Sequence, residues 1–358
     1  MAVHPIAHLH AHSFGPMTQV DVALSPGLNV ITGDNGTGKS QILKLLYSAV
    51  NVVSGDATLT KTVLSTAIAN KLTGVFRPDS LGRLASRTQG RSRAEIGVKF
   101  SGISSPLDFS FASNSRREVR IGSVPGRAVP DTPVFLPSRE LLSLYPGLAA
   151  LYDTRETEFD ETWRDTALLL GRPALRGPRG RLAADVLRPL LDVMEGQVVE
   201  DGGRFFVRLP TGGNSIANVE AHLVSEGFRK LAMIIRLVSS GVLLQGGYLF
   251  WDEPEANLNP RTQRAVAQAI ILLAESGTQV FVATHSVFLL RELEMIQNAR
   301  ADRDGTGASY IGLYRAEGPD QGVRAEVGTD PSELSTITAL EEETSQSLRY
   351  LGVAPDDH

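Results

Sequence analysis

Residues 33–40, Gly-Asp-Asn-Gly-Thr-Gly-Lys-Ser, have the types and spacing of a loop that binds phosphate. They follow the apolar run 28–32 and precede a helix expected over residues 41–50, which is the setting that gives the G-x-x-x-x-G-K-[ST] pattern its meaning. Glycines let successive N–H groups point at phosphate oxygens, and the helix N-terminus adds positive potential there. Lys39 would reach the β- and γ-phosphates, and the Ser40 hydroxyl would bind Mg²⁺. The alternative is a glycine-rich turn that binds nothing.

Two further polar groups follow apolar runs. Asp252 and Glu253 come directly after residues 248–251, at the end of a predicted buried strand, where ligands of open α/β sheets bind. Asp252 would complete the Mg²⁺ shell and Glu253 would polarise the attacking water; an exposed acidic turn is the alternative. His285 follows the run 279–283 and could contact the γ-phosphate, although a histidine at a strand end can also be purely structural.

Ser225-Glu226-Gly227 stand at the start of an amphipathic segment, residues 221–238, that predicts a helix. Serine and glycine at a helix N-terminus form an anion site without a bulky side chain. The same residues also suit a plain helix cap.

Composition bounds the class of protein. The 358 residues carry a formal net charge of −5 and a sequence pI of about 5.9, so no overall basic field indicates nucleic-acid binding. The chain has no cysteine, which excludes disulfides, thiolate metal sites and a cysteine nucleophile. We find neither an apolar run of the roughly 20 residues needed to cross a bilayer nor a signal peptide, and therefore expect a cytoplasmic protein without membrane contact.

Alternating and helical patterns predict an α/β fold: a mixed or parallel sheet flanked by helices, with an antiparallel β lobe attached. Residues 51–94 show no clear periodicity. Strands are expected at 6–12, 19–24, 28–32, several within 95–123, 134–136, a hairpin within 198–209, 247–251, 279–283 and 310–314. Helices are expected within 139–196, interrupted at 171–173 and 177–180, and at 221–238, 260–275, 287–296 and 332–350.

Four segments occur in order: GDNGTGKS, SEGFRKL, YLFWDEPEANLNP and VFVATHS. Together they resemble the ABC-type ATPases that are not transporters, the SMC, RecF and OLD-like group with the AAA15/AAA21 ATPases of bacteria. The run FLPSRE followed by LYDTRETEFDETW resembles the inserted helical lobe of defence-associated ATPases such as the Septu ATPase PtuA. The resemblance implies a P-loop NTPase fold of ABC-ATPase type. Its parts would be an N-terminal part of the head over 1–138, an inserted helical lobe over 139–196 and a C-terminal part over 197–358.

By this resemblance ATP and Mg²⁺ are the cofactors, and two heads would pair head to tail. Glu253, His285 and Lys39 would be the catalytic residues, while Ser40 and Asp252 would hold Mg²⁺. The ATP contacts would be Asn35, Gly36, Thr37, Gly38, Lys39, Ser40 and Gln41, with Ser225, Gly227 and Asn257 supplied in trans by the second protomer.

The sequence departs from the transporter ATPases at two points. The LSGGQ signature is replaced: Val224 stands at its leucine and Phe228 follows the glycine. No clear Q-loop glutamine is present, and its best positional candidate, the end of residues 134–140, carries none.

We therefore expect a Mg²⁺-dependent ATPase that forms a homodimer or higher homo-oligomer and controls a separate effector, a nuclease or toxin, in a prokaryotic anti-phage defence system. The effector is placed on another chain because no HNH-like, PD-(D/E)xK-like or TOPRIM-like residue set follows the ATPase core. The alternative is a RecF/SMC-like DNA-repair or DNA-clamp ATPase. A transporter subunit would need the longer signature.

Three weaker patterns remain open. Two arginine runs could follow a nucleic-acid backbone or could simply be solvated loops. His8, His10 and His12 alternate along one predicted strand, which suits either a metal site or a structural role. The arginines are Arg83, Arg87, Arg91 and Arg93 in the first run, and Arg172, Arg176, Arg179 and Arg181 in the second.

Overall fold

The computed structural model describes residues 2–86, 92–145, 147–154, 158–175, 178–210, 216–244, 246–300, 307–317, 322–335 and 338–351. Its strands are β1 (Ile6–Phe14), β2 (Met17–Ala23), β3 (Leu28–Gly33), β4 (Arg93–Phe100), β5 (Leu107–Ala112), β6 (Arg120–Ser123), β7 (Val134–Leu136), β8 (Gln197–Asp201), β9 (Arg204–Pro210), β10 (Ile216–Glu220), β11 (Tyr248–Asp252), β12 (Gln279–Ala283), β13 (Ala308–Arg315) and β14 (Val323–Gly328). Its α-helices are α1 (Lys39–Val52), α2 (Lys61–Phe76), α3 (Gly147–Asp153), α4 (Glu161–Leu170), α5 (Pro178–Met194), α6 (Glu226–Ser239), α7 (Pro260–Glu275), α8 (Val287–Asn298) and α9 (Thr338–Tyr350). Short 3₁₀ helices are η1 (Leu81–Leu84), η2 (Ala221–Leu223) and η3 (Pro331–Glu333).

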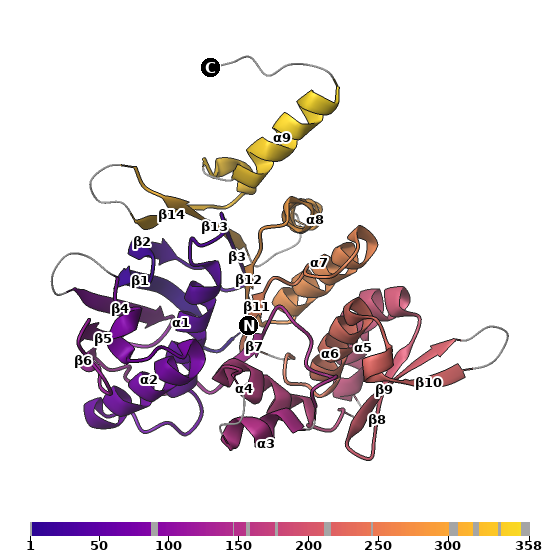
Figure 1. The fold of residues 1–358 in the computed structure, drawn as a ribbon, viewed down its shortest axis with the longest axis horizontal. Coiled ribbons are helices and arrows are strands. Elements are labelled where there is room, and N and C mark those ends of the chain that lie inside the picture. Colours follow the sequence, from indigo (N-terminus) through magenta and orange to yellow (C-terminus); the bar gives the residue numbers. More distant parts are fainter. Residues whose placement is uncertain are drawn as a thin grey trace.

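Within the described residues, one 11-stranded sheet runs through the molecule in the order β6-β5-β4-β1-β2-β14-β13-β3-β12-β11-β7 (Figure 1). The strands from β13 to β7 pair in parallel through β3, β12 and β11, whereas β2, β1, β4, β5 and β6 pair antiparallel. The predicted parallel sheet and antiparallel lobe are thus two halves of one hydrogen-bonded sheet, and the expected α/β class is correct.

Alternate residues of the central strands enter two different cores. Val282 of β12 packs with α5 to α8, while the neighbouring Phe281 packs with α1 and α2 on the opposite face. Both faces of β3, β11 and β12 are therefore buried, which explains why these strands read as continuous apolar runs. The outcome is a sandwich of helices around the strands whose carboxyl ends carry the candidate site.

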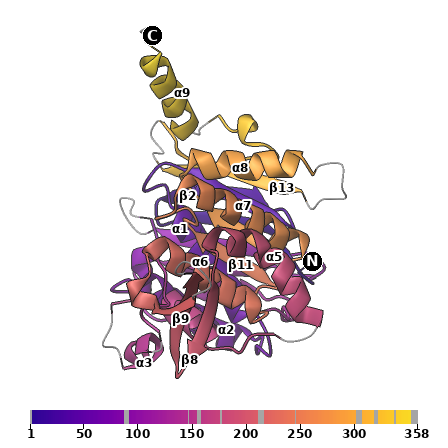
Figure 2. The ribbon, with the colours of Figure 1, turned by 90° about the vertical axis from the view of Figure 1, so that its right-hand side faces the viewer.

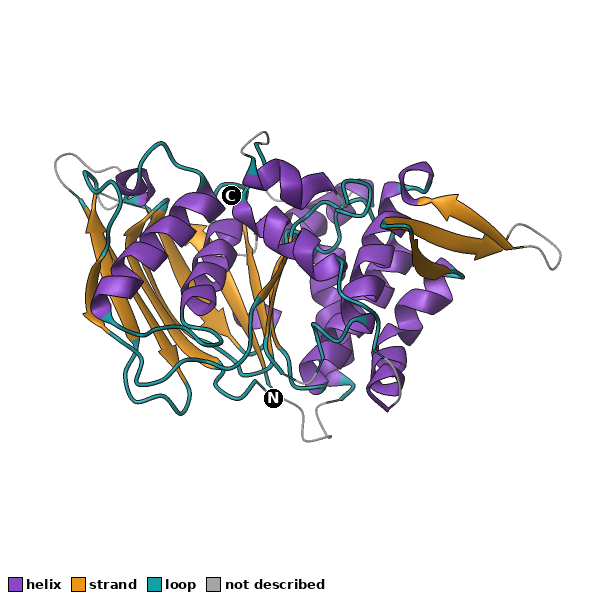
Figure 3. Cartoon of the chain, turned by 90° about the horizontal axis from the view of Figure 1, so that it is seen from below, coloured by secondary structure: helices purple, strands orange, loops and turns teal. Residues whose placement is uncertain are grey.

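A helical segment and a small sheet lie at the end of the molecule opposite the antiparallel strands (Figure 3). The segment consists of α3, α4 and α5, and β10-β9-β8 form a separate three-stranded antiparallel sheet beside α6. Helix α9 projects from the body beyond α8 (Figure 2).

Local sequence signals predicted the starts of α7 and α8 correctly. The Asn259 side chain accepts a hydrogen bond from the Thr262 amide at 3.0 Å, and Pro260 occupies the first helical position, as predicted. Ser286 caps α8 in the same way through the Leu289 amide.

Several expectations were wrong. Helix α2 lies in the stretch without clear periodicity, and strands β10 and β14 were not expected. Helix α5 begins at Pro178, inside the expected break at 177–180 rather than after it. Helix α6 begins at Glu226 rather than 221, because a 3₁₀ turn precedes it, and α9 begins at Thr338 rather than 332 for a similar reason.

No helix among the described residues is long and apolar enough to span a bilayer.

Candidate functional site

The phosphate-loop candidate connects β3 to α1 with a backbone that glycine alone adopts easily. Gly33, Gly36 and Gly38 have φ values of 141°, 79° and 97°. A Cβ on Gly33 would lie 2.3 Å from the Leu313 carbonyl oxygen of β13, so a side chain has no room there. The glycines of the motif are therefore required by main-chain geometry.

Lys39 opens α1 and folds its ammonium back onto the loop. Its Nζ donates to the Gly33 oxygen at 2.7 Å and to the Asp34 oxygen at 3.0 Å. Burial lowers the pKa of Lys39, against the attraction of the Glu253 and Asp252 carboxylates. A cation held at the mouth of a helix N-terminus suits an anionic ligand.

Ser40 and Asp252 lie in contact at the carboxyl end of strand β11. The Ser40 hydroxyl donates to Asp252 Oδ1 at 2.9 Å, although the two residues lie on α1 and β11. Burial raises the pKa of Asp252 to about 6; the Ser40 bond lowers it and the neighbouring Glu253 carboxylate raises it. A hydroxyl and a buried carboxylate are oxygen ligands that suit Mg²⁺, which takes its remaining ligands from phosphates and water.

Glu253 lies just beyond β11 in a left-handed backbone conformation with φ of 46°. Its amide donates to the Ala283 oxygen of β12 at 2.9 Å. Its Oε1 lies 3.3 Å from Nδ1 of His285, which follows β12, and both side chains are partly exposed. The parallel register of β11 and β12 thus brings the two predicted residues together.

The predicted ATP contacts Asn35, Thr37 and Gln41 differ in their burial and in the groups that they contact. Thr37 is buried, and its hydroxyl donates to the Asp34 oxygen within the loop at 2.8 Å, whereas Asn35 is exposed. A Cβ on Gly15, in the β1–β2 turn, would lie 2.0 Å from Gln41 Oε1, so the Gln41 amide lies against that turn.

The signature candidate sits at the start of α6. Ser225 is exposed and occupies the N-cap position, but its side chain makes no capping hydrogen bond. A Cβ on Gly227 would lie 3.0 Å from the Asn257 oxygen, so this glycine allows α6 to approach the turn that follows β11. Asn257 is itself left-handed, with φ of 63°. The structure therefore places Gly227 and Asn257 of one chain in direct proximity.

Glu255 belongs to the site and was not predicted. It is buried, and its Oε1 accepts from the Thr284 hydroxyl at 2.6 Å and from the His285 amide at 3.3 Å. The carboxylate therefore holds the turn after β11 against the turn that carries His285. A second glutamate two positions after Glu253 was the available signal.

Lys230 was also missed. It lies on α6 with its side chain 1% exposed, and its Nζ donates to the main-chain oxygens of Glu253 at 2.7 Å and Ala256 at 3.3 Å. Burial lowers the pKa of Lys230 to about 8, although Glu255 and Glu253 act in the opposite direction. A lysine in an amphipathic helix gives no hint of such a bond in the sequence.

Arg315, at the end of β13, lies beside the phosphate loop. Its Nη2 is 3.4 Å from the Gly36 oxygen, and the residue is exposed. The parallel pairing of β13 with β3 produces this approach, which nothing in the local sequence predicts.

A family model described as "AAA domain, putative AbiEii toxin, Type IV TA system" matches residues 140–291. This range contains Asp252, Glu253 and His285, and the phosphate loop precedes it. No curated protein matches the chain.

Among solved structures, the chain is similar to an Smc head bound to the C-terminal winged-helix domain of ScpA, with a TM-score of 0.53 and 12% identity over 92% of this chain and 99% of that chain. It is also similar to the Smc head domain with an extended coiled coil bound to the C-terminal domain of ScpA from Pyrococcus furiosus, with a TM-score of 0.51 and 13% identity over 96% of this chain and 100% of that chain. At such identities the likeness concerns the fold, which is that of an ABC-type P-loop ATPase head.

The family match and the fold support an ATPase of the AAA/ABC, SMC-head-like type.

The end of residues 134–140, the positional candidate for a Q-loop, contacts α6. Glu140, which is buried, lies 2.6 Å from Nε of Arg229 and also accepts from the Ser143 hydroxyl. Arg229 donates in addition to the Val224 oxygen at 2.5 Å. The stretch after β7 therefore anchors the helix that carries Ser225 and Gly227.

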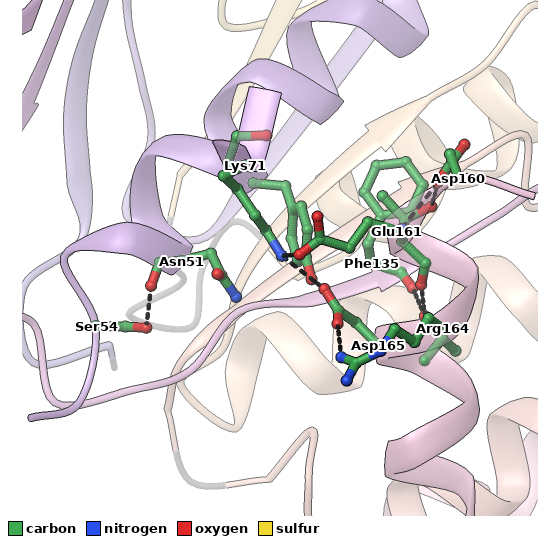
Figure 4. Close-up of polar contacts among 12 residues, drawn as sticks. Asn51, Ser54, Lys71, Phe135, Asp160, Glu161, Arg164 and Asp165 are labelled. Atoms are coloured by element: carbon green, nitrogen blue, oxygen red, sulfur yellow. Dashed lines mark hydrogen bonds and ion pairs between the residues drawn. The ribbon is translucent and has the colours of Figure 1, made fainter. Parts of the chain in front are cut away.

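A polar cluster joins the helical segment to α1 and α2 (Figure 4). Lys71 of α2, which is almost fully buried, bonds to Glu161 at 2.8 Å and to Asp165 at 2.7 Å, both on α4. The Tyr47 hydroxyl of α1 donates to the same Asp165 at 2.6 Å. These bonds fix α4 against the helix that begins at the phosphate loop.

The histidine pattern of β1 has a structural explanation. His8 and His10 contact the two oxygens of Asp21 on β2, at 2.8 and 2.9 Å, and the His10 bond is the main cause of a lowered Asp21 pKa. In the part of the chain that the structure describes, no group of three or more candidate ligands has a geometry that could hold a metal ion.

The two arginine runs are only partly visible. Arg87, Arg91 and Arg176 lie outside the described residues, as does the Arg179 side chain. Arg83 and Arg93 are exposed, and the loop after β5 adds Arg116 and Arg117 nearby, because the Gly82 amide donates to the Ser115 oxygen at 2.9 Å.

Proposed function

We propose that this protein is a Mg²⁺-dependent ATPase whose two heads pair head to tail and thereby control a separate effector in a prokaryotic defence system. The observation that carries the ATPase proposal is the bond between Ser40 and Asp252, with Glu253 and His285 at the same edge of the sheet. This arrangement offers a cation site, a carboxylate base and a histidine donor beside one phosphate-binding loop.

Each residue has a distinct role in the proposed reaction. Lys39 would leave the loop carbonyls and bind the β- and γ-phosphates, which compete well for an ammonium group. Mg²⁺ bound at Ser40 and Asp252 would supply positive charge against the phosphate oxygens. Glu253 would orient the attacking water and accept its proton, and His285 would donate a hydrogen bond near the γ-phosphate.

The dimer proposal concerns the exposed start of α6. The Ser225 hydroxyl is not used as a cap, so it is available to a phosphate of a second protomer, and the helix N-terminus favours an anion there. Gly227 and Asn257 would reach the same nucleotide in trans. The boundaries at 138/139 and 196/197 belong to this proposal as the limits of the helical lobe.

The family description names an AAA-domain toxin of a type IV toxin–antitoxin system, which supports a two-component system as the context; that the effector is a separate chain is our own inference. A head that closes on ATP and opens after hydrolysis suits a switch that holds or releases another protein. We propose a cytoplasmic location and a nuclease or toxin as the effector.

The test begins with Glu253→Gln. The variant should bind ATP, lose hydrolysis and accumulate as a dimer in Mg-ATP, whereas Glu118→Gln, at an exposed position on another loop, should behave as the wild type. The two readouts are phosphate release and light scattering after size exclusion. Hydrolysis at the wild-type rate by Glu253→Gln would refute the assignment.

The trapped dimer then tests the effector. Glu253→Gln, tagged in its native host and purified in Mg-ATP, should retain a nuclease or toxin in fixed stoichiometry that Lys39→Ala does not retain. Nucleic acid without a protein partner would support the clamp described next.

A second candidate function is a DNA-repair or DNA-clamp ATPase. The contact between Gly82 and Ser115 favours it, because it gathers Arg83, Arg116 and Arg117 at one edge of the antiparallel strands. DNA binding that weakens steeply with salt, and falls in Arg116→Ala/Arg117→Ala but not in Arg127→Ala, would support the clamp. Removal of Arg87 and Arg91 extends the same test.

A further inference from the structure

Lys230 makes contacts that an amphipathic helix does not require. It sits one turn into α6, its side chain is 1% exposed, and its ammonium bonds to the main-chain oxygens of Glu253 and Ala256. Lysines are almost never this buried unless their charge is compensated. An aliphatic side chain would fill the space at a smaller desolvation cost, so the ammonium is retained for what it binds.

The group that it binds is an unusual piece of backbone. Glu253 is a non-glycine residue with φ of 46°, a conformation that persists only where the surroundings impose it. The Glu253 amide is fixed by the Ala283 oxygen, and the Glu253 oxygen accepts both Lys230 Nζ at 2.7 Å and the Ala256 amide at 3.1 Å. Lys230 is the side chain that fixes the carbonyl side of this residue.

The direction of the Glu253 side chain follows from that backbone. With the peptide on each side held, the carboxylate extends to within 3.3 Å of His285 Nδ1 at the edge of the sheet. If the carbonyl were free, the turn 253–256 could relax towards right-handed geometry, and the carboxylate would swing away from this position.

We propose that Lys230 is a positioning residue for Glu253, which sets the carboxylate in place for the attack of water; the inference rests on the proposed ATPase function. Lys230 does not touch the nucleotide, because its Nζ is buried and bonded to its own chain. It acts through Glu253 and therefore affects turnover rather than nucleotide binding.

The experiment compares Lys230→Met with Lys71→Met, which removes another buried lysine from a cluster that does not contact the Glu253 turn. Both variants should lose thermal stability. Lys230→Met should lose about tenfold or more in kcat while KM and ATP affinity stay within about twofold. Lys71→Met should keep kcat within about twofold of the wild type.

A double-mutant cycle shows whether Lys230 acts through Glu253. In the Glu253→Gln background, Lys230→Met should cause no further loss of the residual hydrolysis rate, followed in single turnovers at high enzyme concentration, because the group it positions is already gone. Lys230→Arg, which keeps charge and donors, should recover part of kcat. If Lys230→Met does not fold, Lys230→Gln, which keeps one donor group, enters the same cycle.

The proposal would be overturned by an unchanged kcat in Lys230→Met, by a loss of ATP affinity as large as the loss of kcat, or by additive losses with Glu253→Gln. An equal loss of kcat in Lys71→Met would reduce Lys230 to a general stability role and would also overturn it. If the wild type does not hydrolyse ATP, or Glu253→Gln hydrolyses it normally, the proposed function itself fails and the inference falls with it.

Discussion

The buried carboxyl group of Asp252 affects both the stability of the fold and the proposed binding of Mg²⁺. Its pKa of about 6 lies above the usual 3.8. Between about pH 4 and 6 the folded protein therefore keeps the proton on this carboxyl group, whereas the unfolded chain has already lost it. The stabilising effect of this proton is complete below pH 4 and is lost as the pH rises through 6. The carboxylate that a cation needs becomes the major form only above that value.

The pH dependence of Mg²⁺ binding follows from this. Between pH 7.5 and 5.5 the ionised fraction of Asp252 falls about fourfold, so Mg²⁺ affinity measured calorimetrically with a non-hydrolysable nucleotide should fall by about the same factor beyond the effect of nucleotide protonation. Asp252→Asn serves as the control and should show only the nucleotide effect. Equal pH profiles for both proteins would contradict the assignment of Asp252.

The proposed role of Lys39 in binding ATP can be tested directly by measuring ATP affinity. Lys39→Ala removes the buried ammonium that bonds to the Gly33 and Asp34 oxygens of the loop, so ATP affinity should fall by about tenfold or more. Equilibrium binding of a fluorescent ATP analogue gives the value. Lys61→Ala, at an exposed start of α2, should bind as the wild type does.

At the scale of helices and strands, the close contact between α6 and the turn after β11 determines how these elements pack. Gly227→Ala would place a methyl group 3.0 Å from the Asn257 oxygen and force α6 away from the turn after β11. We expect a loss of roughly 1–2 kcal/mol in unfolding free energy, measured by urea denaturation, together with reduced turnover. Gly147→Ala, where a Cβ meets nothing within 4 Å, is the matched control and should cost little.

The docking of α4 on α2 is a second contact between elements. Lys71→Met leaves Glu161 and Asp165 without their shared cation, so unfolding free energy should fall by about 2 kcal/mol. Asp165→Asn added to Lys71→Met should recover part of the loss, because it removes one uncompensated charge. A double variant less stable than Lys71→Met alone would argue against this pairing.

Sequence reasoning succeeded where the signal was local. The strand ends at Gly33 and Asp252 and the caps Asn259 and Ser286 each depend on a few consecutive residues. Helix α2 was missed although it buries Leu64, Ile68, Leu72 and Val75 at helical spacing, because threonines and serines between them weaken the pattern. Lys230, Arg315 and the partner of Glu140 depend on which strands and helices meet, and a single sequence does not contain that information locally.

At the scale of the whole molecule, the proposed head-to-tail dimer predicts complementation. Lys39→Ala lacks a working phosphate loop and Ser225→Arg lacks a working signature, so each alone should be inactive. A mixture should form heterodimers in which one of the two composite sites is intact, with recovery of about a quarter of wild-type activity. Phosphate release from the mixture is the measurement, and no recovery would mean that the site is completed within one chain.

The single sheet explains how distant segments reach one edge. Strand β3 lies between β13 and β12, so the phosphate loop receives Arg315 from one neighbour and His285 from the other. The antiparallel strands belong to the same sheet, because β14 pairs with β13 on one side and with β2 on the other.

The tight contact between Gly227 and Asn257 has a mechanical consequence. A contact that one added methyl group would already crowd, with Lys230 bonded across it, is poorly suited to act as a hinge. The start of α6 and the turn after β11 would then move as one rigid unit. In that unit Glu253 would contact the nucleotide bound by its own chain, and Ser225 would contact the nucleotide bound by the partner protomer. In such a dimer hydrolysis at either site would loosen both, and the two nucleotides would be released in one opening rather than in two half-steps.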